Sequence, residues 1–256
     1  LHSDSCDTRS DQYVCGCESP LGSAPALMAT IPSVFQSPTY TVRNAFAFHA
    51  LNTYTHNVIT WGEAPYGGNS SSVSIDSNVK SVAQTRYSYA AVKHSGSVHA
   101  WGDKSAFARI DALSTASISR LVSTEVSLVG IMVAPHGLFA CGSRNAGGSI
   151  PLDIGTYLSM QIKNVIATAA AFAALTIAGD VFTWGNVHCG AGPSSLNTPA
   201  LTGIKFLAST REAFAAVTHT GRVYSWGGKM AGGNSSLVAS ALSSGVVHVV
   251  GGRTVF

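Results

Sequence analysis

The chain has 256 residues, of which 46% are hydrophobic and only 11% are charged, and its formal net charge is +3. So few charged side chains exclude a highly charged disordered chain and a long coiled coil, and they give no basis for predicting nucleic-acid binding. Glycine is frequent, with 26 residues, which favours many short strands and turns over long helices.

Residues 1–23 are predicted to form a polar extension that contains three cysteines, Cys6, Cys15 and Cys17. A disulfide between Cys6 and either Cys15 or Cys17 would staple a segment that has no visible core, and it favours an oxidising compartment. Zinc binding is one alternative, although Cys15-Gly16-Cys17 lacks the usual two-residue gap, and reduced, incidental cysteines are another. The chain begins at Leu1 and has no basic-then-apolar leader. We therefore expect a processed chain or a fragment, in an oxidising or organellar compartment such as the plastid lumen rather than the cytosol.

Residues 24–256 carry an internal repeat of about 40 residues. Its mark is a Trp-Gly dipeptide, with Cys-Gly in the third unit, and the intervals are 40, 40, 43 and 42 residues. The five pairs are Trp61-Gly62, Trp101-Gly102, Cys141-Gly142, Trp184-Gly185 and Trp226-Gly227. Six residues after the Trp or Cys, a glycine turn follows in every unit except the second, which has Ala106 and Phe107 there.

Two apolar segments joined by a glycine turn precede each Trp-Gly pair, as in EAFAAVTHTGRVYSWG of residues 212–227. In units two to five, a third apolar segment comes before these, as at Ile204–Leu207. Short, β-branched, glycine-bounded runs predict strands rather than helices. Each unit is then three or four short strands, too small to bury its faces alone, and radial stacking solves that problem. The predicted fold is an all-β propeller, with an open solenoid as the alternative.

The pattern of paired alanines, turn glycine, Trp-Gly and glycine turn resembles the repeats of the regulator of chromosome condensation. The short period is similar to the compact propeller of this type in a bacterial β-lactamase inhibitor, and the Tyr-Gly-Gly variant at residues 66–68 resembles repeat arrays of unicellular algae. The resemblance covers about residues 39–252 and implies a propeller of this type. It carries over no functional residue.

Five units occupy residues 39–242, and Val246–Phe256 resembles the start of a sixth. The segment Ala24–Phe35 could supply complementary strands, so we expect a ring closed by both termini. An opened ring that leans on a partner is the alternative. The most apolar stretch, Val165–Ala178, is too short to cross a bilayer and is predicted to form two adjacent buried strands.

No catalytic, cofactor or metal site is predicted. The 12 carboxylates are scattered, and the sequence contains neither a nucleophile elbow nor a phosphate loop. Four histidines fall at equivalent hairpin turns, which should place one in each blade, too far apart to share an ion; they are His56, His94, His136 and His219. The Asn-Ser-Ser runs at Asn69 and Asn234 match the glycosylation pattern but are read as turns, in which Asn bonds to the backbone.

The sequence favours a non-catalytic scaffold that binds other proteins, in its specific form an accessory subunit of a larger assembly. The resemblance of the repeat to algal arrays points to an organellar, photosynthetic membrane complex, and the chain would bind the peripheral face of that complex. Guanine-nucleotide exchange on a small GTPase and inhibition of an enzyme are alternatives implied by the resemblance. Aromatic loop residues would be the contact anchors, namely Tyr66, Phe107 and Tyr157.

Overall fold

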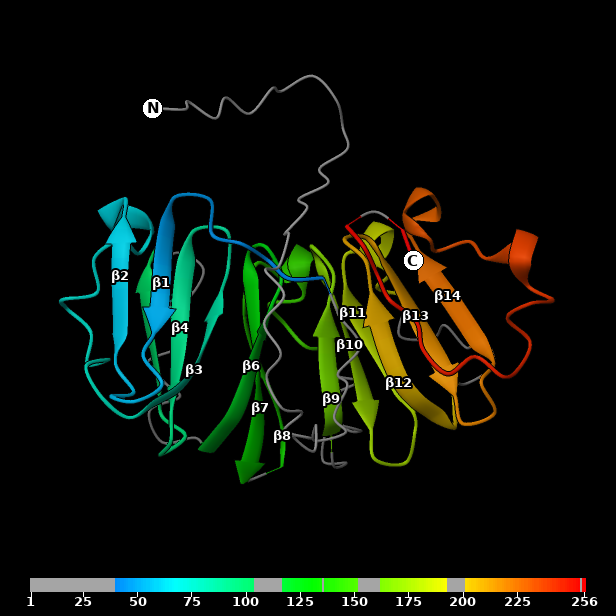
Figure 1. Ribbon diagram of the computed structural model, residues 1–256, viewed down its shortest axis with the longest axis horizontal. Coiled ribbons are helices and arrows are strands. Elements are labelled where there is room, and N and C mark those ends of the chain that lie inside the picture. The colour runs from blue at the N-terminus through cyan, green and yellow to red at the C-terminus, as the bar shows by residue number, and fades with distance from the viewer. Residues whose placement is uncertain (1–39, 104–116, 135, 152–161, 193–200, 254) are drawn as a thin grey trace, which may run out of the picture. The chain divides into compact units, whose positions relative to one another are not determined.

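The computed structural model describes residues 40–103, 117–134, 136–151, 162–192, 201–253 and 255–256. Within them the chain forms five antiparallel sheets in chain order (Figure 1). Sheet 1 has two strands and sheets 2 to 5 have three each. Their bounds are β1 Ala47–Leu51 and β2 Val58–Gly62; β3 Val79–Gln84, β4 Ser88–Lys93 and β5 Val98–Gly102; β6 Ser117–Ser123, β7 Ser127–Ala134 and β8 Gly137–Gly142; β9 Ile162–Ala167, β10 Ala171–Thr176 and β11 Val181–Gly185; β12 Ile204–Ser209, β13 Ala213–Thr218 and β14 Val223–Gly227.

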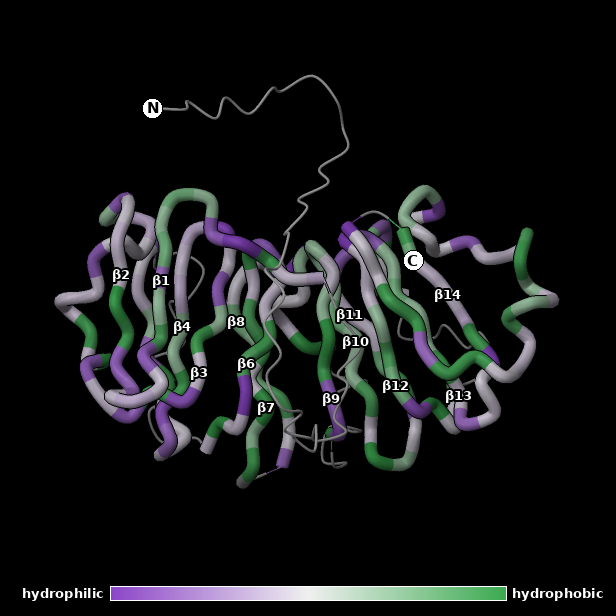
Figure 2. The backbone as a smooth tube through the Cα atoms, in the orientation of Figure 1, coloured by the Kyte–Doolittle hydropathy of each residue, from purple (hydrophilic) through white to green (hydrophobic). Residues whose placement is uncertain are grey.

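The core lies between neighbouring sheets, and hydrophobic residues concentrate in the strands rather than the turns (Figure 2). The middle strands β4, β10 and β13 are buried on both faces, β10 along its whole length, whereas β7 is buried only in its first half. The alanines of β4, β10 and β13 leave room for the next sheet to approach closely, which explains why the repeat pairs alanines with single large residues. The stretch Val165–Ala178 falls on β9 and β10, which confirms the prediction of two adjacent buried strands.

Three of the four Trp residues of the repeat, Trp101, Trp184 and Trp226, join their own sheet to the glycine turn of the preceding one. The indole Nε1 of Trp184 donates to the carbonyl oxygen of Gly147 at 3.0 Å, and Trp101 and Trp226 make the same bond to Gly67 and Gly190. The ring of Trp184 stacks on Phe172 of the same sheet, with ring centroids 5.5 Å apart. Gly147 has φ +83°, and a Cβ there would lie 2.5 Å from Cδ2 of Phe172, so the position demands glycine.

Two irregularities of the repeat lie in successive units, where the second unit has Phe107 instead of the turn glycine and the third has Cys141 instead of Trp. Phe107 lies outside the described residues. Cys141 is buried in the cluster that contains Leu121 and Leu128.

Backbone bonds between the turns link neighbouring units at both ends of the strands. At one end the N–H of Arg86 donates to the carbonyl of Glu125 at 2.8 Å, and equivalent residues repeat this bond. The linked residues are Ala45, Arg86, Glu125, Ala169, Arg211 and Arg253, with N···O distances of 3.1, 2.8, 2.9, 2.7 and 2.9 Å in chain order. We call this series the turn chain. At the other end, Ile204 donates to Gly179 of the preceding sheet at 3.0 Å.

Residues 246–256 hold the place of a sixth unit. Val246 donates to Gly221 at 3.0 Å, as Ile204 does to Gly179, and Arg253 closes the turn chain. A Cβ on Gly232 would lie 2.5 Å from Cδ2 of Phe256, which repeats the contact of Gly147 with Phe172. The predicted start of a sixth unit is thus present. Closure by both termini stays a prediction because residues 1–39 lie outside the described part of the chain, and so does the boundary at residue 23.

Three further predictions concern features away from the sheets. Cys6, Cys15 and Cys17 lie outside the described residues, so their pairing stays a prediction. Both Asn-Ser-Ser runs are turns, because Oδ1 of Asn69 accepts from the N–H of Ser71 at 2.9 Å and Asn234 does the same for Ser236 at 3.1 Å. Within the described ranges, no helix has the length and apolar character needed to cross a membrane.

Candidate functional site

Sheet 1 has one covered and one uncovered face. Ala47 and Val58 face sheet 2 and are buried in the cluster that contains Tyr89 and Trp101. Because side chains alternate along a strand, the intervening residues of β1 and β2 point away from sheet 2. These include the large apolar residues Phe48, Ile59 and Trp61, which we call the uncovered face. Phe46 precedes β1, is 37% exposed, and stacks on Tyr87 with ring centroids 5.8 Å apart.

The exposure of the uncovered face departs from the rest of the repeat. Phe48 is 64% exposed, whereas its counterparts Tyr89, Phe172 and Phe214 are 0% exposed. Trp61 is 50% exposed, whereas Trp101 and Trp184 are 2% exposed. The residue types are the ones that form the sheet junctions, so the difference lies in what packs against them.

The internal geometry of an interior junction is nevertheless present on this face. Phe48 and Trp61 are paired across β1 and β2 and stack with ring centroids 5.5 Å apart, which equals the Phe172–Trp184 distance. No described residue accepts a hydrogen bond from Nε1 of Trp61, the bond that Gly67, Gly147 and Gly190 supply elsewhere. Sheet 1 therefore presents one half of a junction, with the aromatic pair in place and the glycine turn missing.

Tyr66 extends the aromatic surface from the turn that follows β2. It lies on the 3-10 helix η1 (Ala64–Tyr66), and its ring centroid is 4.4 Å from that of Phe46 and 5.7 Å from that of Tyr87. Nδ2 of Asn44 donates to the Tyr66 carbonyl at 3.0 Å and holds the turn. The structure thus places one predicted contact residue beside the uncovered face, and its role there stays a prediction. Phe107 and Tyr157 lie outside the described residues.

The side chains packed behind the uncovered face, Tyr89 and His49, are uncharged at neutral pH. Burial raises the pKa of Tyr89 to about 12, and its hydroxyl donates to the carbonyl of Ala47 on β1. Burial also lowers the pKa of His49, whose ring meets that of Tyr89 edge-on at 5.0 Å. Both shifts favour the neutral forms, so the strands that carry the face rest on a neutral core.

One prediction about the turn histidines is wrong. His56 and His94 were expected to lie far apart in separate blades, but their ring centroids are 5.1 Å apart. The reason is a backbone bond between units at the end of the strands opposite the turn chain. There the N–H of Val79 in sheet 2 donates to the carbonyl of His56 and brings the two hairpin turns together. No group of three or more metal-binding side chains occurs within the described part of the chain.

No protein-family model and no curated protein sequence matches the chain. Among solved structures, it is similar to the entire ectodomain of the receptor kinase CR4 from Physcomitrella patens, with a TM-score of 0.50, 13% identity, and coverage of 72% of this chain and 49% of that one. It is also similar to Prp20p from Saccharomyces cerevisiae, at a TM-score of 0.49 and 16% identity over 73% and 56% of the two chains. The CRINKLY WD40 ectodomain of ACR4 from Arabidopsis thaliana gives 0.48 and 15% over 72% and 61%.

The chain thus spans between about half and three fifths of the length of these three structures. The stacked antiparallel sheets, together with the likeness to the moss ectodomain, show an all-β fold of propeller blades. At these identities the likeness shows the fold alone.

The sequence analysis missed Phe48 and Ile59 of the uncovered face. A signal was present, because units two to five have a third apolar segment before the strand pair and unit one was not found to have one. An incomplete first unit predicts that its sheet packs against a segment from outside the unit. Which of its side chains are exposed depends on which face of each sheet meets the preceding turn, and only the structure shows that.

Proposed function

We propose that the chain is a non-catalytic protein–protein interaction module that binds a partner protein through the uncovered face of sheet 1. The observation that carries the proposal is the exposure of Phe48 and Trp61, since the equivalent Phe172 and Trp184 are both buried and, of the pair Phe214 and Trp226, the Phe is buried and the Trp is partly buried. Contiguous exposed aromatic residues mark interaction surfaces in soluble proteins, and Trp and Tyr are enriched among the residues that dominate binding energy.

The interior junctions indicate what such a partner presents. Trp184 receives a backbone carbonyl from a left-handed glycine, and Phe172 packs against that glycine directly. A partner with a glycine turn flanked by apolar side chains would satisfy Trp61 Nε1 and cover Phe48 in the same way. Burying both rings would contribute through the hydrophobic effect, and the hydrogen bond would set the orientation.

In its narrower form, the proposal makes the chain an accessory subunit of a larger assembly. The stacking of an apolar face on a neighbouring sheet suits a lasting interface more than a transient one. An organellar photosynthetic complex rests on the resemblance of the repeat to algal arrays and stays a prediction. Guanine-nucleotide exchange and enzyme inhibition also rest on resemblance, and no feature of the uncovered face favours either.

The test compares two double variants of the tagged chain expressed in its source. Phe48→Ser with Trp61→Ser removes the aromatic pair, and Met230→Ser with Leu237→Ser removes two exposed apolar side chains of the fifth unit as the matched control. Native size in gentle extracts is measured by sedimentation, and hydroxyl-radical footprinting reports the exposure of Trp61.

We expect the wild-type chain and the control to migrate with a particle larger than the chain and to show a protected Trp61. The aromatic variant should migrate as the free chain. The proposal is wrong if the aromatic variant stays with the particle, or if the wild-type chain migrates alone with Trp61 as reactive as in the purified protein.

A further inference from the structure

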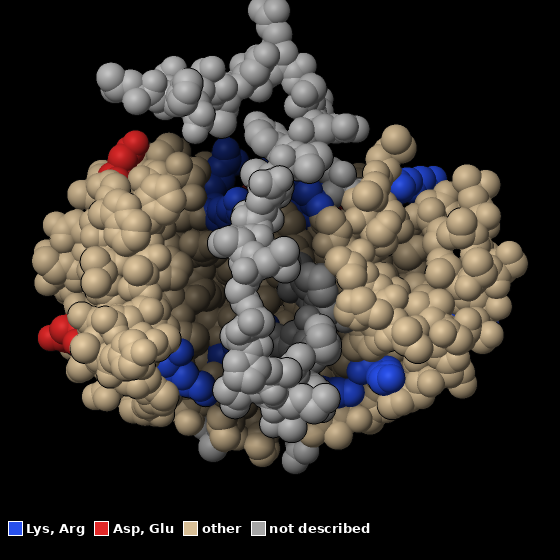
Figure 3. All heavy atoms as spheres, viewed as in Figure 1, with Lys and Arg blue, Asp and Glu red and all other residues tan. Residues whose placement is uncertain are grey.

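A second surface, which is charged rather than aromatic, lies at the turn chain. Arg86, Glu125, Arg211 and Arg253 occupy four of its six positions, so the backbone bonds between units gather their side chains at one end of the strands. On the face seen in Figure 3, the basic side chains in view lie in its upper and lower parts, whereas the acidic ones lie at one edge. The turn chain therefore brings charged side chains of separate units to one end of the strands.

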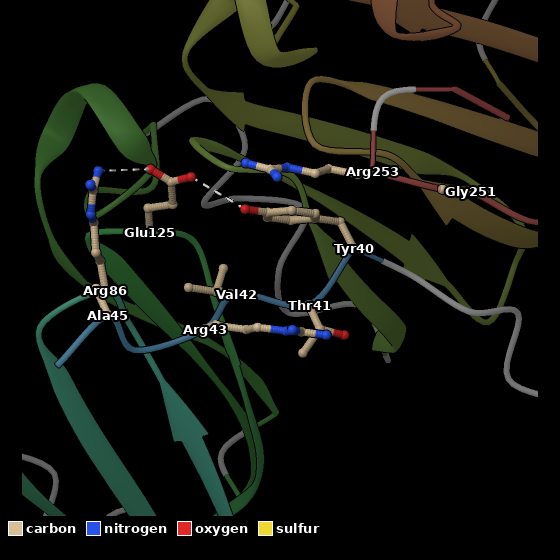
Figure 4. Close-up of a pocket in the computed structure, with 10 residues that line it drawn as sticks. Tyr40, Thr41, Val42, Arg43, Ala45, Arg86, Glu125, Gly251 and Arg253 are labelled. Carbon is tan, nitrogen blue, oxygen red and sulfur yellow. Dashed lines mark hydrogen bonds and ion pairs between the residues drawn. The ribbon is translucent and has the colours of Figure 1, made fainter. Parts of the chain in front are cut away.

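Three of these side chains, Arg86, Glu125 and Arg253, line a cavity of about 590 Å³, which we call the arginine cavity. Its wall contains three arginines, one glutamate, a tyrosine and two glycines without side chains, among other residues; they are Arg43, Arg86, Arg253, Glu125, Tyr40, Gly251 and Gly252. Figure 4 shows the side chains of Arg253 and Tyr40 extending toward Glu125, which Arg86 approaches from the other side. The cavity is thus lined by donors from several turns.

Glu125 shows that this arrangement can hold a carboxylate. Its Oε1 accepts from the Tyr40 hydroxyl and from Nη2 of Arg211, both at 3.2 Å, and Oε2 lies 4.0 Å from Nη1 of Arg86. Burial and the Glu125 charge raise the pKa of Tyr40, which keeps the hydroxyl protonated as a donor. Arg211 also pairs with Glu212, at 3.0 Å, so both of its carboxylate partners belong to the chain.

The positive charge of the cavity exceeds what Glu125 neutralises. Arg43 and Arg253 are exposed and form no ion pair with another described residue. A guanidinium presents a planar fork of donors that matches a carboxylate. Two such forks, from the first and sixth units, have no ion-pair partner among the described residues and can bind further carboxylates.

We propose that the arginine cavity binds the carboxylates of an acidic peptide segment of a partner protein. Single exposed ion pairs contribute little, so affinity needs several arginines at once. The arginines come from three different turns, which favours an extended ligand with repeated charges over a small ion. This inference concerns a different surface from the uncovered face and does not depend on the function proposed for it.

The test measures fluorescence anisotropy of a labelled peptide of alternating Asp and Gly, with a peptide of alternating Asn and Gly as the uncharged control. The purified full chain is compared with Arg43→Ser/Arg253→Ser. A variant with the same loss of charge, Lys205→Ser/Arg222→Ser, serves as the matched control because both residues are exposed and neither lines the cavity. Circular dichroism verifies that each variant is folded.

We expect the acidic peptide to bind, to be released by salt, and to lose about tenfold in affinity only in Arg43→Ser/Arg253→Ser. Glu125→Gln should change affinity in the opposite direction, since it removes the competing carboxylate. An unchanged affinity in Arg43→Ser/Arg253→Ser, an equal loss in the matched control, or binding of inorganic pyrophosphate without binding of the acidic peptide would overturn the proposal.

Discussion

The junction between sheets 3 and 4 and the uncovered face of sheet 1 contain the same aromatic pair in different surroundings. Phe172 and Trp184 are covered by the turn of Gly147, whereas Phe48 and Trp61 stack at the same distance and face solvent. The pair therefore assembles within its own sheet and does not require the neighbouring turn. The turn adds burial and one hydrogen bond. The contribution of each aromatic residue to stability therefore depends on what packs against it rather than on its position in the repeat.

The largest difference should follow removal of the indole. Trp184→Ala is expected to lower the free energy of unfolding by about 3–5 kcal/mol, because a fully buried ring leaves a cavity. Trp61→Ala should lower it by about 1 kcal/mol or less, because that ring is already half exposed. Urea denaturation measures both. If Trp184→Ala does not fold, Trp184→Phe removes the bond to Gly147 and keeps most of the volume. Equal losses at the two positions would contradict the comparison.

A smaller effect is expected on the turn side of the same junction. Gly147→Ala adds a methyl group 2.5 Å from Phe172 in a left-handed backbone and should cost about 2–4 kcal/mol. Gly203→Ala is the matched control, since its φ is +65° and nothing lies within 4 Å of an added Cβ. The control should show only the backbone cost of about 1 kcal/mol, again by urea denaturation. A control that costs as much as Gly147→Ala would show that packing against Phe172 contributes nothing.

The junction between sheets 1 and 2 differs from the others because its aromatic residue is Tyr89, whose hydroxyl bonds to Ala47. The pKa of Tyr89 is raised from 10.0 to about 12, so above pH 10 the unfolded chain loses this proton first and folding stability falls. We expect a loss on the order of 2 kcal/mol between pH 10 and pH 12. Tyr89→Phe should be less stable at pH 8 but should show a shallower decline. Parallel pH profiles of the two proteins would assign the decline to other groups.

The smallest stability effect is expected at the arginine cavity. Arg253→Ser removes an exposed side chain without an ion pair among the described residues and should change the free energy of unfolding by about 0.5 kcal/mol or less. Glu125→Gln should cost more, because Tyr40 and Arg211 both lose a charged acceptor. Thermal melts of the two variants under the same conditions compare them. A larger loss in Arg253→Ser would show that this arginine supports the fold.

Several features could be predicted from the sequence because they arise within one unit. The Trp-Gly period, the glycine turns and the alanine-rich middle strands follow from the local needs of a short hairpin, and the structure places β13 and β14 where residues 213–227 predict them. The uncovered face could not be predicted in this way, because Phe48 has the same residue type as Phe172 and differs only in having no turn packed on it.

Sequence alone therefore determined the all-β repeat, its period and the start of a sixth unit, since each depends on side-chain alternation and turn chemistry that a single chain segment specifies. Tertiary structure decided which aromatic pairs are buried and how Arg43, Arg86 and Arg253 come to line one cavity. The physical reason is that these properties belong to contacts between different units, and only the folded arrangement of the sheets brings residues that are far apart in the sequence into contact.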